Sequence, residues 1–96
     1  MLMTVLEAKV DPEKTSLLEQ DFRQGIEHLD AGIVQTFLLR GVGASDLWRI
    51  LTVWESREAL DAMRASGETP RGVLIFRAAG AEPSLSIFEL RAQAAA

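Results

Sequence analysis

The sequence predicts an α+β domain in which a four-stranded antiparallel sheet carries its helices on one face. Four stretches have the residue pattern of strands, and helix start signals and glycine-bearing turns separate them. Of the 96 residues, 48% are hydrophobic and 25% are charged, as in ordinary globular proteins. A chain of this length is the size of one domain, so we expect residues 1–96 to fold as a single unit.

The first strand is predicted at residues 2–10, where the side chains alternate with the two-residue period of a strand. Asp11 and Pro12 then mark a helix start, because aspartate can cap a free backbone N–H and proline fits the first helical position. With Gly32 as a stop signal, we expect this helix at residues 12–30. Its apolar stripe consists of Leu18, Phe22, Ile26 and Leu29.

A β-hairpin is predicted next in the chain. Residues 33–40 are rich in β-branched and aromatic side chains, residues 41–46 form a glycine-bearing turn, and residues 47–55 form the partner strand. Ser56 is a favourable N-cap, so we expect a short second helix that runs from there to Ser66.

The following segment has two interpretations. Thr69 and Pro70 repeat the cap-plus-proline signal and Gly80 supplies a stop, which favours a third helix at residues 70–79. The apolar run at residues 73–76 also suits a strand, which is the competing interpretation.

A final strand at residues 85–91 completes the order β-α-β-β-α-(α)-β, the split βαβ order of ferredoxin-like folds. The face of the sheet opposite the helices would then be uncovered. We assign Trp48, Ile50 and Trp54 to that face, where they would form an apolar patch that a monomer rarely tolerates. We therefore expect a homodimer in which a second copy covers the patch.

Composition excludes several classes of function. The net charge is −4 and no stretch clusters Lys or Arg, so we expect no nucleic-acid binding. The chain has no cysteine, hence no disulfide or thiolate metal site, and we expect a reducing, cytoplasmic location. Glu7 and Lys9 interrupt the apolar start of the chain, so we expect no membrane span. His28 is the only histidine and is expected to be a surface helix residue rather than a metal ligand.

The segment Thr52-Val53-Trp54-Glu55-Ser56-Arg57-Glu58-Ala59-Leu60 resembles the signature segment of the antibiotic biosynthesis monooxygenase (ABM) family, of the dimeric α/β-barrel superfamily. The order of elements and the Ala81-Glu82-Pro83 lead into the last strand extend the resemblance over nearly the whole chain. It implies a dimer whose two facing sheets enclose a cavity. There, quinone-forming members oxidise polycyclic aromatic substrates with dioxygen and no cofactor, while other relatives degrade haem.

The resemblance also makes Trp54 the first candidate for substrate binding, because the tryptophan of this motif lines the cavity in quinone-forming members. Strand alternation places three further side chains beside it, and Met63 stands where many members carry a histidine on the second helix. The expected substrate-binding residues are Trp54, Thr52, Ile50, Trp48 and Met63.

The catalytic residues known in the family cannot be carried over to this chain. Ile50 stands where quinone-forming members have an asparagine, and Leu60 stands near the position of their tyrosine, a residue type that this chain lacks. The catalytic residues therefore stay unassigned. An oxidation would have to use a different set, drawn from Trp54, Thr52, Glu7 and Arg49.

Three hypotheses about function follow. The first is a cofactor-independent monooxygenase that acts on a hydrophobic aromatic small molecule in the dimer cavity. The second is a non-catalytic protein that binds a small molecule in the same cavity, which the loss of the family's hydrogen-bond donors favours. The third is a structural dimer whose own large side chains fill the cavity.

Overall fold

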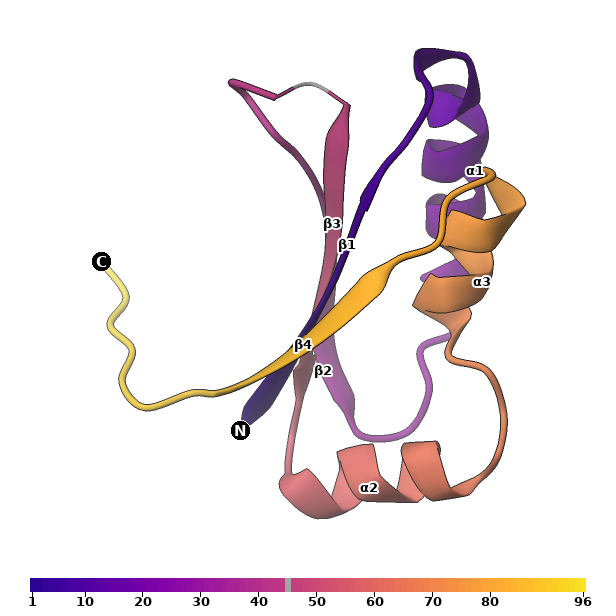
Figure 1. Ribbon diagram of the computed structural model, residues 1–96. Coiled ribbons are helices and arrows are strands. Elements are labelled where there is room, and N and C mark those ends of the chain that lie inside the picture. The colour runs from indigo at the N-terminus through magenta and orange to yellow at the C-terminus, as the bar shows by residue number, and fades with distance from the viewer. Residues whose placement is uncertain (45) are drawn as a thin grey trace.

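The computed structural model describes residues 1–44 and 46–96, so the predicted turn at residues 41–46 lies partly outside the described residues. One four-stranded sheet stands beside three α-helices (Figure 1). The elements are β1 (Leu2–Lys9), the 3-10 helix η1 (Pro12–Lys14), α1 (Thr15–Gly25), β2 (Ile33–Arg40), β3 (Leu47–Trp54), α2 (Arg57–Ala65), α3 (Arg71–Ala78) and β4 (Ser84–Glu89).

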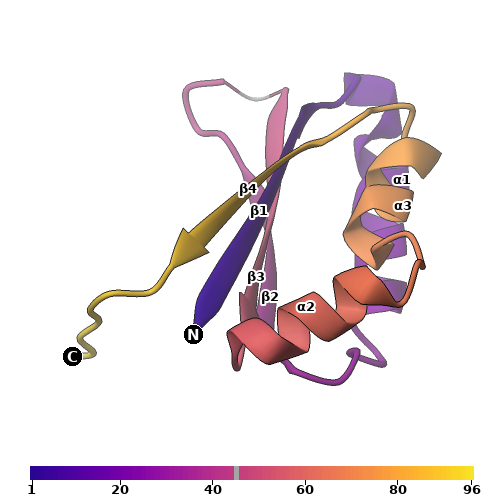
Figure 2. The same cartoon turned by 60° about the horizontal axis from the view of Figure 1, so that its bottom comes forward.

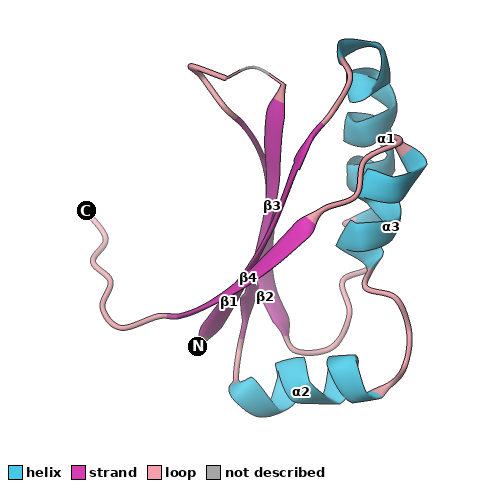
Figure 3. Ribbon diagram, in the orientation of Figure 1, coloured by secondary structure: helices cyan, strands magenta, loops and turns pink. Residues whose placement is uncertain are grey.

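The strands lie in the order β2-β3-β1-β4, and every neighbouring pair is antiparallel. All three α-helices lie on one side of this sheet (Figure 3). The fold is therefore the α+β ferredoxin-like arrangement with the split βαβ order that the sequence predicts. Within the described residues, no helix is long and apolar enough to cross a membrane.

Two of the predicted capping residues act as caps, although Asp11 caps the 3-10 helix η1 and α1 itself begins only at Thr15. The Asp11 side chain accepts a hydrogen bond from the Glu13 backbone N–H (3.0 Å), and Ser56 Oγ accepts one from the Ala59 backbone N–H (3.1 Å). Both bonds satisfy backbone donors that have no partner inside the helix.

The first helix ends earlier than predicted, at Gly25 instead of residue 30. Arg71, at the start of α3, donates hydrogen bonds to the carbonyl oxygens of Gly25 and His28, which helix continuation would otherwise use. Gly32 has a left-handed backbone (φ +89°) and lies so close to Ala59 that a side chain would collide with it.

The helical interpretation of residues 70–79 is confirmed, and the competing strand is wrong. Pro70 itself occupies the cap position, and Gly80 follows the helix with a positive φ of 77°. α3 lies close to the sheet at Gly72, where a Cβ atom would be 2.7 Å from Leu6 Cδ1. α3 packs against α1 and buries Ile75 and Phe76.

The sheet face that carries the tryptophans is not the one the sequence analysis expected. Trp48 and Trp54 point to the helix-covered face, where they are only 3% and 4% exposed in the single chain. Ile50 lies between them and pairs with Leu6 of β1, which is also buried. The assignment of these residues to the uncovered face is therefore wrong. Strand alternation separates the two faces but does not say which one the helices cover.

The uncovered face is nevertheless apolar, and we call it the open face. Phe37, Leu39 and Phe88 are 42%, 43% and 55% exposed on it. The register of the strands places other apolar side chains in the same rows: Met3, Val5, Leu51 and Val53. The C-terminal segment, residues 90–96, runs away from the body on the side opposite the helices (Figures 1 and 2).

Candidate functional site

A pocket of about 250 Å³ lies between the sheet and the helices of a single chain. It borders the main core cluster at Ile50 and the small second cluster at Trp54 and Leu60. Its lining is mostly apolar, and lining residues such as Leu29 (46%) and Leu85 (50%) remain half exposed, so the pocket is partly open to solvent. Apart from Trp48, the candidate residues thus point into a pocket within one chain and not into the expected cavity between two facing sheets.

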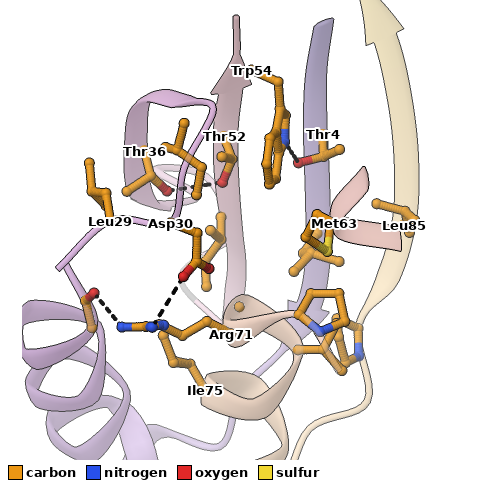
Figure 4. A pocket seen from close by; sticks show the side chains of 18 of the residues that line it. Thr4, Leu29, Asp30, Thr36, Thr52, Trp54, Met63, Arg71, Ile75 and Leu85 are labelled. Carbon is orange, nitrogen blue, oxygen red and sulfur yellow. Dashed lines mark hydrogen bonds and ion pairs between the residues drawn. The ribbon is translucent and has the colours of Figure 1, made fainter. Parts of the chain in front are cut away.

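The floor of the pocket is a row of threonines across three strands. Thr4 of β1 pairs with Thr52 of β3, and Thr52 pairs with Thr36 of β2, so the three side chains share one row and one face. The Thr36 and Thr52 hydroxyl oxygens are 3.0 Å apart and share a hydrogen bond. The Trp54 indole N–H donates to Thr4 Oγ1 (3.1 Å), as Figure 4 shows. We call Thr36, Thr52 and Thr4 the threonine row.

This row keeps hydrogen-bonding capacity for a ligand. One hydroxyl hydrogen of the Thr36–Thr52 pair is used between the two oxygens, and the other has no acceptor in the described part of the chain. Thr4 accepts from Trp54, and its own hydroxyl hydrogen likewise has no acceptor among those residues. Two unused O–H donors therefore lie on the floor of a mostly apolar pocket.

The walls come from the three α-helices of the described residues and from the edge strand β4. Met63 from α2 and Ile75 from α3 belong to these walls, and Leu85 of β4 lies at one side (Figure 4). The remaining apolar wall residues include Phe22, Ile26, Leu29, Ile33, Leu60, Val73 and Ile87. Such a lining favours an apolar ligand with few polar groups.

Arg71, at the start of α3, binds the loop that follows α1 beside the pocket. Its guanidinium donates to the Gly25 carbonyl (3.0 Å) and the His28 carbonyl (3.2 Å), and it forms an ion pair with Asp30 (3.4 Å). Figure 4 shows the Asp30 side chain directed at Arg71. The contacts hold the 26–32 loop in place as one wall of the pocket.

A second arginine–carboxylate pair lies on the other side of the lining. Arg77 donates two hydrogen bonds of 2.9 Å to the two oxygens of Glu82, just before β4. These hydrogen bonds raise the pKa of Arg77 and lower the pKa of the Glu82 carboxyl, because both favour the charged forms. Both side chains are exposed, so the pair fixes geometry more than it adds stability.

His28 lies in the turn after α1 instead of on the helix surface, and it is exposed and contributes to the pocket lining. Its backbone carbonyl accepts the hydrogen bond from Arg71 described above. In the residues that the structure describes, no group of three or more His, Cys, Asp or Glu side chains could hold a metal ion.

Four of the five predicted substrate-binding residues line this one pocket: Trp54, Thr52, Ile50 and Met63. Trp48 does not, because it belongs to the packed core at the other end of β3. Its indole N–H is buried and has no hydrogen-bond partner among the described residues, and the Arg40 guanidinium lies 5.4 Å from its ring centroid. That the four bind a substrate stays a prediction.

Glu7 and Arg49, considered as alternatives for catalysis, cannot reach the pocket. They pair across β1 and β3 on the open face, with 2.6 Å between Arg49 Nε and Glu7 Oε1. The strands of the sheet separate them from the threonine row, so neither can act on a ligand there.

Thr4, Thr36 and Arg71 were not predicted to lie at the site. Alternation along β1 did place Thr4 on the same side as Leu6, which was a usable signal. The register that brings Thr4 into one row with Thr52 and Thr36 depends on pairing between β1 and β3, which are distant in the sequence.

Comparison with known structures reproduces the fold over nearly the whole chain. A putative antibiotic biosynthesis monooxygenase from Deinococcus radiodurans matches with a TM-score of 0.74 and 11% identity, covering 100% of this chain and 98% of that chain. SnoaB, a cofactor-independent oxygenase from Streptomyces nogalater, matches with a TM-score of 0.71 and 18% identity, covering 96% and 94%. MhuD, a haem degrader from Mycobacterium tuberculosis solved with two haems in its active site, matches with a TM-score of 0.69 and 22% identity, covering 99% and 100%.

Identities this low show a shared fold and leave the activity of this chain open. No curated protein matches the chain. The family model of the antibiotic biosynthesis monooxygenases does match it, over residues 1–72, which include the threonine row, Trp54 and Met63. The chain therefore belongs to the antibiotic biosynthesis monooxygenase family.

Proposed function

We propose that the protein binds a hydrophobic aromatic small molecule in the pocket between sheet and helices, and oxidises it with dioxygen without a cofactor. The observation that carries this proposal is an apolar pocket of about 250 Å³ with unused hydroxyl donors on its floor. A volume near the lower end of ligand pockets suits roughly two or three fused rings. Family membership and the likeness to SnoaB support the reaction type.

The floor suits an oxygen substituent on the aromatic ligand. A phenol that loses its proton becomes a phenolate, and O–H donors held in an apolar site stabilise that negative charge more than water-exposed donors would. Thr4 and the Thr36–Thr52 pair supply such donors. The Trp54 N–H is used to hold Thr4, so Trp54 orients a donor and offers its ring face to the ligand.

In the proposed reaction a phenol and one dioxygen molecule give a quinone and one water molecule. The phenolic O–H bond and the ring C–H bond opposite it break, and the ring carbon gains one oxygen atom as a carbonyl. The second oxygen atom leaves as water with the two hydrogens, so dioxygen is the oxidant. His28 lines the pocket and is the proposed acceptor of the phenolic proton.

The experiment is turnover of naphthols and hydroxyanthracenes, followed by oxygen consumption and product spectra. Trp54→Phe removes the N–H that holds Thr4, and we expect turnover to fall by about tenfold or more. Trp48→Phe is the matched control, because Trp48 lies on the same strand outside the pocket, and turnover should stay within about twofold. Equal effects of the two substitutions would contradict the proposal.

Non-catalytic binding in the same pocket is the second candidate, favoured by one observation. Ile50 lines the pocket and cannot form hydrogen bonds, whereas the family's quinone-forming members place an asparagine there. Under this candidate a naphthol raises the melting temperature while no oxygen is consumed. An inert panel without any thermal shift would refute both candidates.

We infer that the open face is covered by a second copy of this chain. Phe37, Leu39 and Phe88 form an apolar surface that single soluble domains seldom expose, and a two-fold axis would let the surface cover itself. Phe37→Asp should convert a dimer to a monomer in light scattering at micromolar concentration. An unsubstituted protein that is already monomeric there would contradict the inference.

A further inference from the structure

The charged side chains of the pocket lining do not balance. The lining holds the arginines Arg64, Arg71 and Arg77 but only two carboxylates, Asp30 and Glu82. With His28 neutral the lining has a net charge of +1, while the whole chain has a net charge of −4. Positive charge is thus concentrated at the pocket of an acidic protein.

The excess charge belongs to one residue. Arg71 is paired with Asp30, and Arg77 with Glu82, so each carboxylate of the lining already has its arginine. Arg64, in the last turn of α2, has no ion-pair partner among the described residues. It is exposed, so its guanidinium stays hydrated and can turn toward a group at the mouth of the pocket.

We propose that the pocket takes an aromatic anion, whose ring system lies over the threonine row and whose carboxylate or sulfonate group is bound by Arg64. This inference rests on the proposed binding function and adds the charge of the ligand to it. Arg64 is the candidate because the other two arginines among the described lining residues, Arg71 and Arg77, are already paired with carboxylates. A planar anionic group can receive two hydrogen bonds from one guanidinium.

Two fluorescent probes with the same ring system distinguish the effect of the ligand's charge from binding of its rings in the pocket. Anilinonaphthalene sulfonate carries the anionic group, and N-phenylnaphthylamine is its neutral counterpart. We expect Arg64→Gln to weaken binding of the sulfonate by about three- to fivefold, the range of an exposed ion pair, and to leave the neutral probe within about twofold. Raising the salt concentration to about 0.5 M should weaken binding of the sulfonate and leave binding of the neutral probe unchanged.

Arg57→Gln is the matched control. Arg57 lies at the start of the same helix, is exposed and does not line the pocket, so its removal changes the net charge equally. Equal losses in Arg57→Gln and Arg64→Gln would overturn the inference, because a general charge effect would then explain them. A sulfonate affinity that Arg64→Gln leaves unchanged would overturn it as well.

A further variant separates failure of this inference from failure of the proposed function. Leu29→Trp fills the pocket from a half-exposed loop position, where the fold is at little risk. It should weaken binding of both probes. If neither probe binds, or if Leu29→Trp changes the affinity of neither probe, the pocket does not hold aromatic molecules. The proposed function then fails together with the inference.

Discussion

The two tryptophans of β3 lie on the same face of the same strand, six residues apart, yet in opposite surroundings. Trp48 lies where α1 and α3 cover the sheet and the core is closed, with Leu18 and Phe76 completely buried. Trp54 lies at the end of the sheet where α2 is found (Figure 2). At this end Trp54 lines the pocket between the sheet and the helices. We call these regions the packed end and the hollow end.

The polar groups differ in the same way. At the packed end the Trp48 indole N–H is buried and finds no hydrogen-bond partner in the described part of the chain, whereas at the hollow end the Trp54 N–H is bonded to Thr4. Close packing at one end has been obtained at the cost of an unsatisfied donor, while the other end keeps space and directed donors. Residue type therefore does not distinguish a tryptophan of the closed core from one that lines a pocket, but the packing around it does.

The largest expected effect contrasts one side chain from each end. Phe76→Ala should lower the free energy of unfolding by about 3–5 kcal/mol, because it empties closely packed space. Met63→Ala should cost only about 1 kcal/mol, because Met63 is partly exposed and already borders the pocket. Urea unfolding followed by circular dichroism measures both.

Because a small domain is only marginally stable, Phe76→Leu provides a milder variant that should still cost more than Met63→Leu. Equal losses at the two positions would remove the distinction between a packed end and a hollow end.

A smaller effect compares the tryptophans themselves. Trp54→Phe breaks the hydrogen bond to Thr4 and should cost about 1 kcal/mol. Trp48→Phe loses packing volume but also removes an unsatisfied buried donor, so its change in stability should lie within about 1 kcal/mol of zero. Thermal unfolding of the two variants measures which substitution lowers stability more. A clearly larger loss of stability for Trp48→Phe than for Trp54→Phe would contradict the prediction.

The smallest effect concerns the exposed Arg77–Glu82 pair of the pocket lining. Arg77 lowers the pKa of Glu82 in the folded state, so the pair stabilises the fold above the unfolded-state pKa of Glu82. That contribution is lost as the pH falls through the lowered folded-state pKa. Glu82→Gln should therefore make stability slightly less dependent on pH in the acidic range. Unfolding profiles of wild type and variant that coincide at every acidic pH would contradict the pair's role.

Most elements of the fold can be predicted from local signals. The strand at residues 33–40 has the predicted bounds, the caps Asp11 and Ser56 act as expected, and Pro70 with Gly80 brackets the third helix. These features depend on residues close together in the sequence, whose preferences can be read directly.

The end of α1 and the orientation of the sheet could not be predicted, for two physical reasons. The helix stops at Gly25, where Arg71, far along the chain, binds the carbonyls of Gly25 and His28, and no local pattern records that contact. Both faces of β3 are apolar, with Trp54 on one and Leu51 on the other, so hydrophobicity alone could not show which face the helices cover.

The candidate site was predicted in part, for related reasons. Trp54, Thr52, Ile50 and Met63 came from a local motif and from alternation, and they meet at one pocket. The threonine row and its bond from Trp54 depend on register between strands, which the order of residues along one strand does not specify.

The central claim is that the hollow end binds an aromatic ligand and the packed end does not. The two tryptophans give two indole N–H signals in a ¹H–¹⁵N correlation spectrum, which Trp48→Phe assigns. On titration with a naphthol, we predict that the Trp54 signal shifts in proportion to occupancy while the Trp48 signal stays in place. A Trp54 signal that does not move while the ligand binds, or a shift confined to Trp48, would contradict the account.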